Sequence, residues 1–275
     1  MTCAGASSPG NVWAFSGANG VEGNLPGTVS ALRLLNGRWT FVRDFPGNNV
    51  SGCNVIGPGN VWVFGGGARI GPAIGTWHLA GSRWTELNTG KIVLINGSVV
   101  GPSDIWATAT NTRTGAPVIE RWNGHSWRPA GSITSVLPKL TKTTQVGLQA
   151  VNALSGSNVW VLADVFRRPA ESVVVVHWDG HKWGRVKPGS AGYYLPTAVS
   201  DGHGGWWSVN YLANVPERYL VHRVGGRWVQ VPLPARLDLA IGAFAHVPHT
   251  NAMLAVGDQF TSGHFEGVVL AFGRL

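Results

Sequence analysis

The most constraining feature of this chain is a tryptophan-bearing segment that recurs six times. Its copies read GNVWAF, GNVWVF, SDIWAT, SNVWVL, GGWWSV and NAMLAV. The anchors are spaced 49, 44, 54, 47 and 46 residues apart: Trp13, Trp62, Trp106, Trp160, Trp207 and, in a degenerate sixth copy, Met253. A regular period of this length is the sequence signature of a repeat architecture.

A second tryptophan series supports the same period. It runs through NGRWTFV, GSRWTEL, GHSWRPA, GHKWGRV and GGRWVQV, and its anchors are Trp39, Trp84, Trp127, Trp183 and Trp228. Both series contain one long interval, and a single insertion at residues 131–147 explains both. Two series that agree on one insertion make chance similarity an inadequate explanation.

Each repeat holds four short strand candidates separated by turn residues. Gly and Trp are abundant (39 and 14 residues) and only 12% of residues are charged, a composition that suits strands and tight turns rather than long helices. We predict an all-β chain: one six-bladed β-propeller domain with four-stranded antiparallel blades. The predicted blades comprise approximately residues 1–44, 45–89, 90–131, 147–188, 189–233 and 234–275.

The repeated pattern NVW, then W-x-G-x-x-W-x-x-V, resembles the tectonin-type propeller repeats of some lectins. It is equally similar to tryptophan-rich repeat proteins common in actinobacteria. The resemblance spans essentially the whole chain, and its motif describes how blades pack rather than how a ligand is held. It implies a bacterial, lectin-like, carbohydrate-binding propeller.

The sixth repeat ends where its fourth strand is expected to begin, so we predict an incomplete last blade. A closed propeller normally completes its last blade with a strand from the opposite end of the chain. We expect this strand, preceded by a signal segment, to lie upstream of Met1 in the natural product, or else blade six to have three strands. A secreted or cell-surface location follows from the first expectation, with the cytoplasm as the alternative.

The segment HWDGHKWGRV (177–186) has the residue types of a metal or acid–base site. An Asp179-Gly180 two-residue turn pairs His177 with Lys182 and Val176 with Trp183, so that His177 and His181 point to opposite faces. The two rings then do not share a metal ion, and we predict a scaffold hairpin and no metal site. The same reasoning assigns the Asn or Asp before each anchor tryptophan to capping of a turn.

Cys3 and Cys53 fall at nearly equivalent places in the innermost strands of blades one and two. Adjacent inner strands at a central channel often lie too far apart for a disulfide, and we expect two free, partly buried thiols.

The net charge is +8, which favours anionic partners. The basic residues are scattered along the sequence, and a nucleic-acid-binding surface requires them to cluster, so we expect no nucleic-acid partner. No stretch of the sequence approaches the length of a membrane span. We expect a monomer without a cofactor.

Function in this architecture is expected at one rim of the channel, where loops between strands two and three meet the loops between blades. Aromatic, arginine and acidic residues there suit a glycan, an acidic small molecule or a protein surface, through stacking and charge-assisted hydrogen bonds. The predicted ligand-binding residues are Arg69, Asp164, Phe166, Arg167, Tyr193, Tyr194, Tyr211, Asp258 and His264.

The leading interpretation is a non-catalytic binding module, lectin-like or protein-binding. The alternative is an enzyme with its active site in the propeller mouth, a cyclase, lyase or hydrolase acting on a secondary metabolite or glycan. Asp164, Asp258, His264 and Tyr194 are then the acid–base candidates. A third reading is an assembly protein that presents a flat propeller face.

Overall fold

The computed structural model describes most of the chain, and every structural statement below concerns the described part. It comprises residues 3–17, 28–35, 37–66, 73–167, 170–186, 199–201, 205–210, 219–224, 227–231, 239–247, 250, 252–261 and 264–272. All elements in these ranges are β-strands. They include no helix with the length and apolar character needed to cross a membrane.

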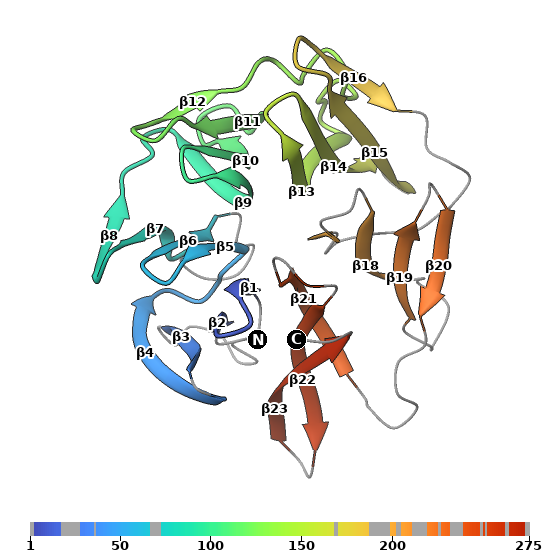
Figure 1. Cartoon of the computed structure of the whole chain (residues 1–275). Coiled ribbons are helices and arrows are strands. Elements are labelled where there is room, and N and C mark those ends of the chain that lie inside the picture. The colour runs from blue at the N-terminus through green and yellow to red at the C-terminus, as the bar shows by residue number, and fades with distance from the viewer. Residues whose placement is uncertain are drawn as a thin grey trace.

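Six antiparallel sheets stand around a central channel, and in each sheet the strands follow one another outward in chain order (Figure 1). The first three blades are β1 (Cys3–Ser8), β2 (Asn11–Gly17), β3 (Thr28–Leu35) and β4 (Arg38–Pro46); β5 (Gly52–Gly57), β6 (Asn60–Gly65), β7 (Gly75–Ala80) and β8 (Arg83–Leu87); β9 (Ile92–Gly101), β10 (Asp104–Asn111), β11 (Pro117–Trp122) and β12 (Trp127–Pro129).

The last three blades continue the ring. They are β13 (Thr144–Ser155), β14 (Asn158–Arg167), β15 (Ala170–Trp178) and β16 (Trp183–Val186); β17 (Val199–Ser200), β18 (Trp206–Asn210), β19 (Tyr219–Val224) and β20 (Arg227–Val231); β21 (Leu239–His246), β22 (Met253–Thr261) and β23 (His264–Phe272). The structure confirms a six-bladed β-propeller whose last blade has three described strands instead of four.

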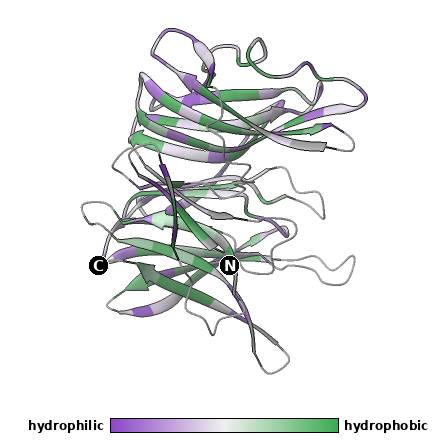
Figure 2. Ribbon diagram, turned by 90° about the vertical axis from the view of Figure 1, so that its right-hand side faces the viewer, coloured by the Kyte–Doolittle hydropathy of each residue, from purple (hydrophilic) through white to green (hydrophobic). Residues whose placement is uncertain are grey.

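Many strand residues are hydrophobic, as the green stretches of the ribbon show (Figure 2). Their buried clusters lie between neighbouring blades rather than at one centre. The second strand of each blade is covered on both sides, and Trp13, Trp62 and Trp106 are each at most 2% exposed. These rings pack on the following blade, because the Trp13 ring lies 5.9 Å from Trp84 and the Trp106 ring 6.2 Å from Trp183. The repeated tryptophans therefore hold the blades together.

The ring closes where blade six meets blade one. Val12 of β2 and Leu254 of β22 belong to one buried cluster at this junction. Leu254, not Met253, takes the place of the anchor tryptophan, since Met253 belongs to the cluster shared with blade five. The prediction for Met253 was wrong by one residue, and a shift of one residue moves a side chain to the other face of a strand.

The hairpin of blade four differs from its predicted register. Trp178 pairs with Trp183 and His177 with Gly184, so the loop holds four residues rather than two. The backbone N–H groups of His181 and Lys182 both donate to Asp179 Oδ1 at 2.9 Å, and this side-chain cap stabilises the longer loop. The alternation of faces holds, because Trp178 packs toward blade three whereas His177 packs against Trp160.

Cys3 and Cys53 form a disulfide between β1 and β5, with their Cα atoms 6.0 Å apart. The expectation of two free thiols was wrong. Small residues let the inner strands approach closely: a Cβ on Gly5 would lie 2.7 Å from a Val55 methyl carbon of the next blade. That approach brings the cysteines within bonding range.

Candidate functional site

The histidine of HWDGHKW belongs to a structural unit that recurs around the ring. The His177 ring packs against Trp160 with centroids 4.3 Å apart and the planes tilted by 34°, and its Nε2 lies 2.9 Å from Asn158 Oδ1. The Trp160 indole N–H donates to the same oxygen at 2.8 Å. The oxygen therefore joins the second strand to the third, and it does not cap the turn as predicted.

The same position in blade three carries an arginine. Arg121 donates from Nε and from a terminal nitrogen to the two carboxylate oxygens of Asp104, at 2.6 and 2.8 Å, and lies 4.9 Å from the Trp106 ring. Blade five uses His222, whose Nε2 lies 2.7 Å from Asp201 Oδ2. Here the turn is capped too, since Gly205 N–H donates to Asp201 Oδ1. These polar groups are blade scaffold.

The structure separates the predicted ligand-binding residues. Asp164, Phe166 and Arg167 lie on β14, and Asp258 and His264 lie in blade six, with blade five between the two sets. Arg69, Tyr193, Tyr194 and Tyr211 lie outside the described residues.

The pleat divides the three predicted residues of β14. Val165 belongs to the core shared with blade three, and side chains alternate along a strand, so Arg167 shares its face. Asp164 and Phe166 lie on the other face, and Asp164 is only 2% exposed. Arg167 and Asp164 therefore do not form one site.

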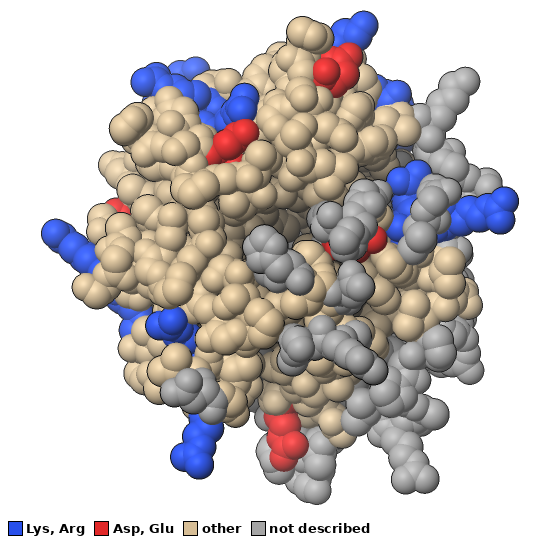
Figure 3. Space-filling view, viewed as in Figure 1, with Lys and Arg blue, Asp and Glu red and all other residues tan. Residues whose placement is uncertain are grey.

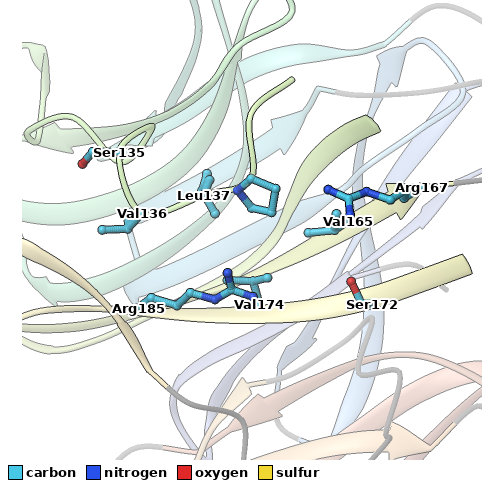
Figure 4. A pocket seen from close by; sticks show the side chains of 9 residues that line it. Ser135, Val136, Leu137, Val165, Arg167, Ser172, Val174 and Arg185 are labelled. Atoms are coloured by element: carbon cyan, nitrogen blue, oxygen red, sulfur yellow. The ribbon is translucent and has the colours of Figure 1, made fainter. Parts of the chain in front are cut away.

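Arg167 lies at a pocket of about 710 Å³ between blades three and four (Figure 4). Its walls come from the loop that follows β12, from β14 and β15, and from the end of β16. The lining residues are Ser135, Val136, Leu137, Pro138, Val165, Arg167, Ser172, Val174 and Arg185. The predicted insertion at 131–147 thus contributes one wall, anchored by Leu137, which is 8% exposed.

The pocket combines an apolar floor with two positive charges. Leu137, Val165 and Val174 are buried, whereas Arg167 and Arg185 are exposed at its edge. In the part of the chain that the structure describes, neither guanidinium makes a hydrogen bond or an ion pair, and the pocket lining contains no Asp or Glu. Both arginines are therefore available to an anion.

Arg185 was missed by the sequence reasoning because it lies within a repeated strand. It follows Trp183 by two positions, where the other blades carry Phe41, Glu86, Pro129 and Gln230. The residue at this position varies among the blades because packing does not determine it. That variability within a repeated strand was the feature of the sequence that could have identified Arg185.

The central channel has a different character. Its described lining is made mainly of small residues of the inner strands, with a volume of about 610 Å³. Amide side chains cross between blades there, as Asn54 Nδ2 donates to the Gly97 carbonyl at 2.9 Å. Asp164 and Asp258 are not among the described lining residues, so this channel does not bring the two acid–base candidates together.

Charged side chains lie around the periphery rather than in one patch on the face seen in Figure 3. In the ranges that the structure describes, no group of three or more His, Cys, Asp or Glu side chains is arranged to hold a metal ion.

Six blades around a channel define the class of this protein, a six-bladed β-propeller. No protein-family model and no curated protein sequence matches the chain. A fucose-specific lectin from Aleuria aurantia has a similar structure, with a TM-score of 0.51, 14% identity, and coverage of 98% of this chain and 94% of the lectin. The Cps50 (Swd1) β-propeller domain from Myceliophthora thermophila gives a TM-score of 0.48 at 11% identity, over 97% of this chain and 96% of that domain. At such identities the likeness to the lectin shows the fold alone.

Proposed function

We propose that this propeller is a non-catalytic binding domain that holds an acidic ligand in the pocket between blades three and four. The observation that carries this proposal is the pair Arg167 and Arg185 at the edge of one pocket with an apolar floor, without an acidic partner in the described lining. Guanidinium groups bind carboxylates and sulfates through paired, charge-assisted hydrogen bonds.

The pocket favours a ligand that is acidic at one end and apolar at the other. Burying apolar ligand surface against Leu137, Val165 and Val174 contributes roughly 25 cal/mol per Å². The hydroxyl groups of Ser135 and Ser172 add hydrogen-bonding capacity. The described lining has no aromatic ring for sugar stacking, so an acidic ligand is favoured over a neutral glycan.

The disulfide supports a location outside the reducing cytoplasm. Disulfides such as Cys3–Cys53 form and persist in secreted, periplasmic and cell-surface proteins. The proposed location is therefore extracytoplasmic. Alkylation of free thiols in intact producing cells, followed by mass spectrometry, tests it: an unmodified, oxidised pair is expected, whereas two alkylated cysteines would contradict it.

Matched ligand pairs test the binding proposal. Hexanoate is compared with hexanamide, and glucuronate with glucose, by the concentration dependence of the melting temperature. The acidic member of at least one pair is expected to stabilise the protein more than its neutral counterpart, and salt is expected to weaken the difference. Equal behaviour of both members in both pairs would contradict the proposal.

Variants of the two arginines locate the site. Arg167→Gln and Arg185→Gln are each expected to weaken binding of the acidic ligand at least about tenfold, as loss of a charge-assisted hydrogen bond implies. Arg83→Gln, on the exposed outer strand β8, is the control and should bind like the unchanged protein. If both variants bind the acidic ligand as tightly as the unchanged protein, the ligand does not bind in this pocket.

A further inference from the structure

The inner strands that surround the central channel share a β-bulge in the first four blades (Figure 1). Near the turn that joins the inner strand to the second strand, the pairing of these two strands shifts by one residue. A bulge leaves one residue unpaired and redirects its side chain. The residues left out of the pairing, all of which line the channel, are Ser7, Ile56, Val100 and Leu154.

The bulges of blades two, three and four place aliphatic side chains at one mouth of the channel. Val100 and Leu154 are 39% and 37% exposed, and Ile56 is half-buried. All three lie at the same end of their strands, next to the turn to the second strand. Together they form a collar, defined by these three residues. Exposed apolar surface beside a cavity is typical of a place where a ligand enters.

A level of polar side chains lies two residues further along the same strands. Its members are Asn54, Ser98 and Asn152, and each pairs with the anchor tryptophan of its blade. Two residues of a β-strand span about 7 Å, which is the distance along the strand from this polar level to the collar. Blades one, five and six carry Gly5, Val199 and Ala245 at the same level. The polar groups therefore lie on one side of the channel.

This polar level has hydrogen-bonding capacity that the described part of the chain does not use. Asn152 is only 1% exposed, and neither its Oδ1 nor its Nδ2 makes a hydrogen bond within the described residues. Asn54 donates from Nδ2 to the Gly97 carbonyl at 2.9 Å, but its Oδ1 accepts from no described group. Buried polar groups are normally paired in proteins, and an unpaired one lowers stability. A partner from outside the chain would relieve this cost.

Ser98 adds one more donor to the polar level. Its Oγ accepts from the Ala153 N–H at 2.9 Å, and its hydroxyl hydrogen is not used in any hydrogen bond among the described residues. The free groups at this level are thus an amide oxygen of Asn54, a hydroxyl hydrogen of Ser98 and the whole amide of Asn152. They include both donors and acceptors, and all of them are neutral.

The described lining of the channel also contains no Asp, Glu, Lys or Arg. His246 is the only residue of this lining that titrates near neutral pH, and its Nε2 lies 3.0 Å from the Thr250 carbonyl oxygen. A charged ligand would lose its hydration in this channel without gaining an opposite charge. The channel volume of about 610 Å³ is that of a small-molecule site, and a neutral ligand is favoured.

We propose that the central channel binds a small neutral amide with a hydrocarbon body, such as a lactam. An amide presents an acceptor beside a donor, and this edge is complementary to the amide of Asn152. No described hydrogen bond holds the Asn152 amide, so a change of its side-chain rotamer turns it toward the ligand. The hydrocarbon part of the ligand packs against the collar, where burial of apolar surface stabilises the complex.

The collar distinguishes an amide from a polyol. A polyol carries hydroxyl groups on all sides, and those that face Val100 and Leu154 would lose their hydrogen bonds to water without replacement. This site lies in the channel, whereas the pocket of Arg167 and Arg185 lies between blades three and four, and neither site depends on the other.

Two lactams of similar shape test this proposal. ε-Caprolactam has both an N–H and a carbonyl group, whereas N-methylcaprolactam retains the carbonyl and has no N–H. Binding to the 275-residue chain is measured by the concentration dependence of the melting temperature. Caprolactam is expected to stabilise the protein saturably and to bind at least tenfold more tightly than its N-methyl derivative. If neither lactam binds, or if both bind equally well, the proposal is wrong.

Variants of the channel locate the site. Asn152→Leu replaces the amide by a side chain of similar volume, and it should weaken caprolactam binding at least tenfold and make the two lactams bind alike. Leu154→Ala, in the collar, should weaken binding of both lactams and does not depend on the folding of the first variant. Leu140→Ala is its matched control, because Leu140 is 38% exposed but lies outside the described channel lining. Unchanged caprolactam binding in Asn152→Leu or in Leu154→Ala would overturn the proposal.

Competition separates this site from the pocket of the two arginines. Caprolactam is expected to bind with the same affinity in the absence and in the presence of a high concentration of hexanoate. Displacement of caprolactam by hexanoate would place the lactam in the arginine pocket and contradict the channel site. If hexanoate itself does not bind, the lactam measurements still decide the proposal for the channel.

Discussion

His177 and Trp160 pack ring against ring, tilted by 34°, and a single side-chain oxygen of Asn158 contacts both. The arrangement recurs in blade two, where His78 stacks on Trp62 at 4.0 Å and lies 3.0 Å from Asn60 Oδ1. Since each unit joins the second and third strands, the charge state of these histidines affects the stability of the whole ring.

Acid is expected to destabilise the propeller through these two histidines. Burial lowers the pKa of His78, and burial outweighs the opposing charge of Asp179 to lower the pKa of His177. A group with a lowered folded-state pKa stabilises the fold above its unfolded pKa, near 6.5, and this contribution is lost as the pH falls through the folded-state value. The melting temperature should therefore fall between pH 7.5 and pH 5.

Calorimetry of variants tests whether these two histidines cause the pH dependence. In the double variant His78→Asn, His177→Asn, the melting temperature should change less between pH 7.5 and pH 5, because asparagine does not titrate. His125→Asn with His181→Asn is the control, since both of these histidines are exposed. If the double variant His78→Asn, His177→Asn loses melting temperature between pH 7.5 and pH 5 as steeply as the unchanged protein, other titratable groups determine its stability in acid.

The disulfide is expected to stabilise the ring between its first two blades. Cys3 and Cys53 are 50 residues apart, and loop-closure entropy for that separation corresponds to about 4 kcal/mol. Cys3→Ser with Cys53→Ser should lower the free energy of unfolding in urea by an amount of this order. Dithiothreitol should lower the stability of the unchanged protein but not of the variant; equal sensitivity of both would contradict the assignment.

Close approach of the inner strands predicts that alanine destabilises the protein at one glycine of β5 and has little effect at another. A Cβ on Gly52 would lie 2.7 Å from Asn96 Oδ1 and 3.0 Å from the Asn96 Cα of the next blade, whereas nothing lies within 4 Å of a Cβ on Gly57. Gly52→Ala should destabilise the protein by about 1–3 kcal/mol through overpacking. Gly57→Ala should change stability little. Similar effects in urea unfolding would refute the close approach of β5 and β9.

Removal of a buried carboxyl group should stabilise the protein at neutral pH. Glu120 is only 4% exposed, and burial raises the pKa of its carboxyl group. A raised pKa means that folding favours the neutral acid, so the charged form costs stability as the pH rises above the unfolded pKa. Glu120→Gln should therefore raise the melting temperature at pH 7. At pH 3.5, where the acid is mostly neutral in both states, the two proteins should melt alike.

The repeat unit could be predicted from sequence because its determinants are local. Hairpin turns and the alternation of side chains placed Trp178 and His177 on opposite faces correctly. The same local reasoning failed at the turn, because the side chain of Asp179 caps two backbone N–H groups and so stabilises a four-residue loop. It also failed at Met253, although the copies GNVWAF and NAMLAV, placed one above the other, put Leu254 in the tryptophan position.

The candidate site could be predicted only in part. Arg167 and the insertion were identified, since both depart from the repeat. Their common pocket with Arg185 could not be foreseen, because it depends on how a loop of blade three folds over blade four. The prediction that Asp164 and Arg167 belong to one site was wrong, because the alternation of side chains along β14 places them on opposite faces of the strand.

The sequence by itself determined the number of blades and the order of the strands within them, because both follow from spacing along the chain and from turn chemistry. Only the tertiary structure decided which distant residues meet. The Cys3–Cys53 bond and the pocket of Arg167 and Arg185 both arise where neighbouring blades approach. Those approaches depend on the packing of side chains from separate repeats, which periodicity within one repeat does not specify.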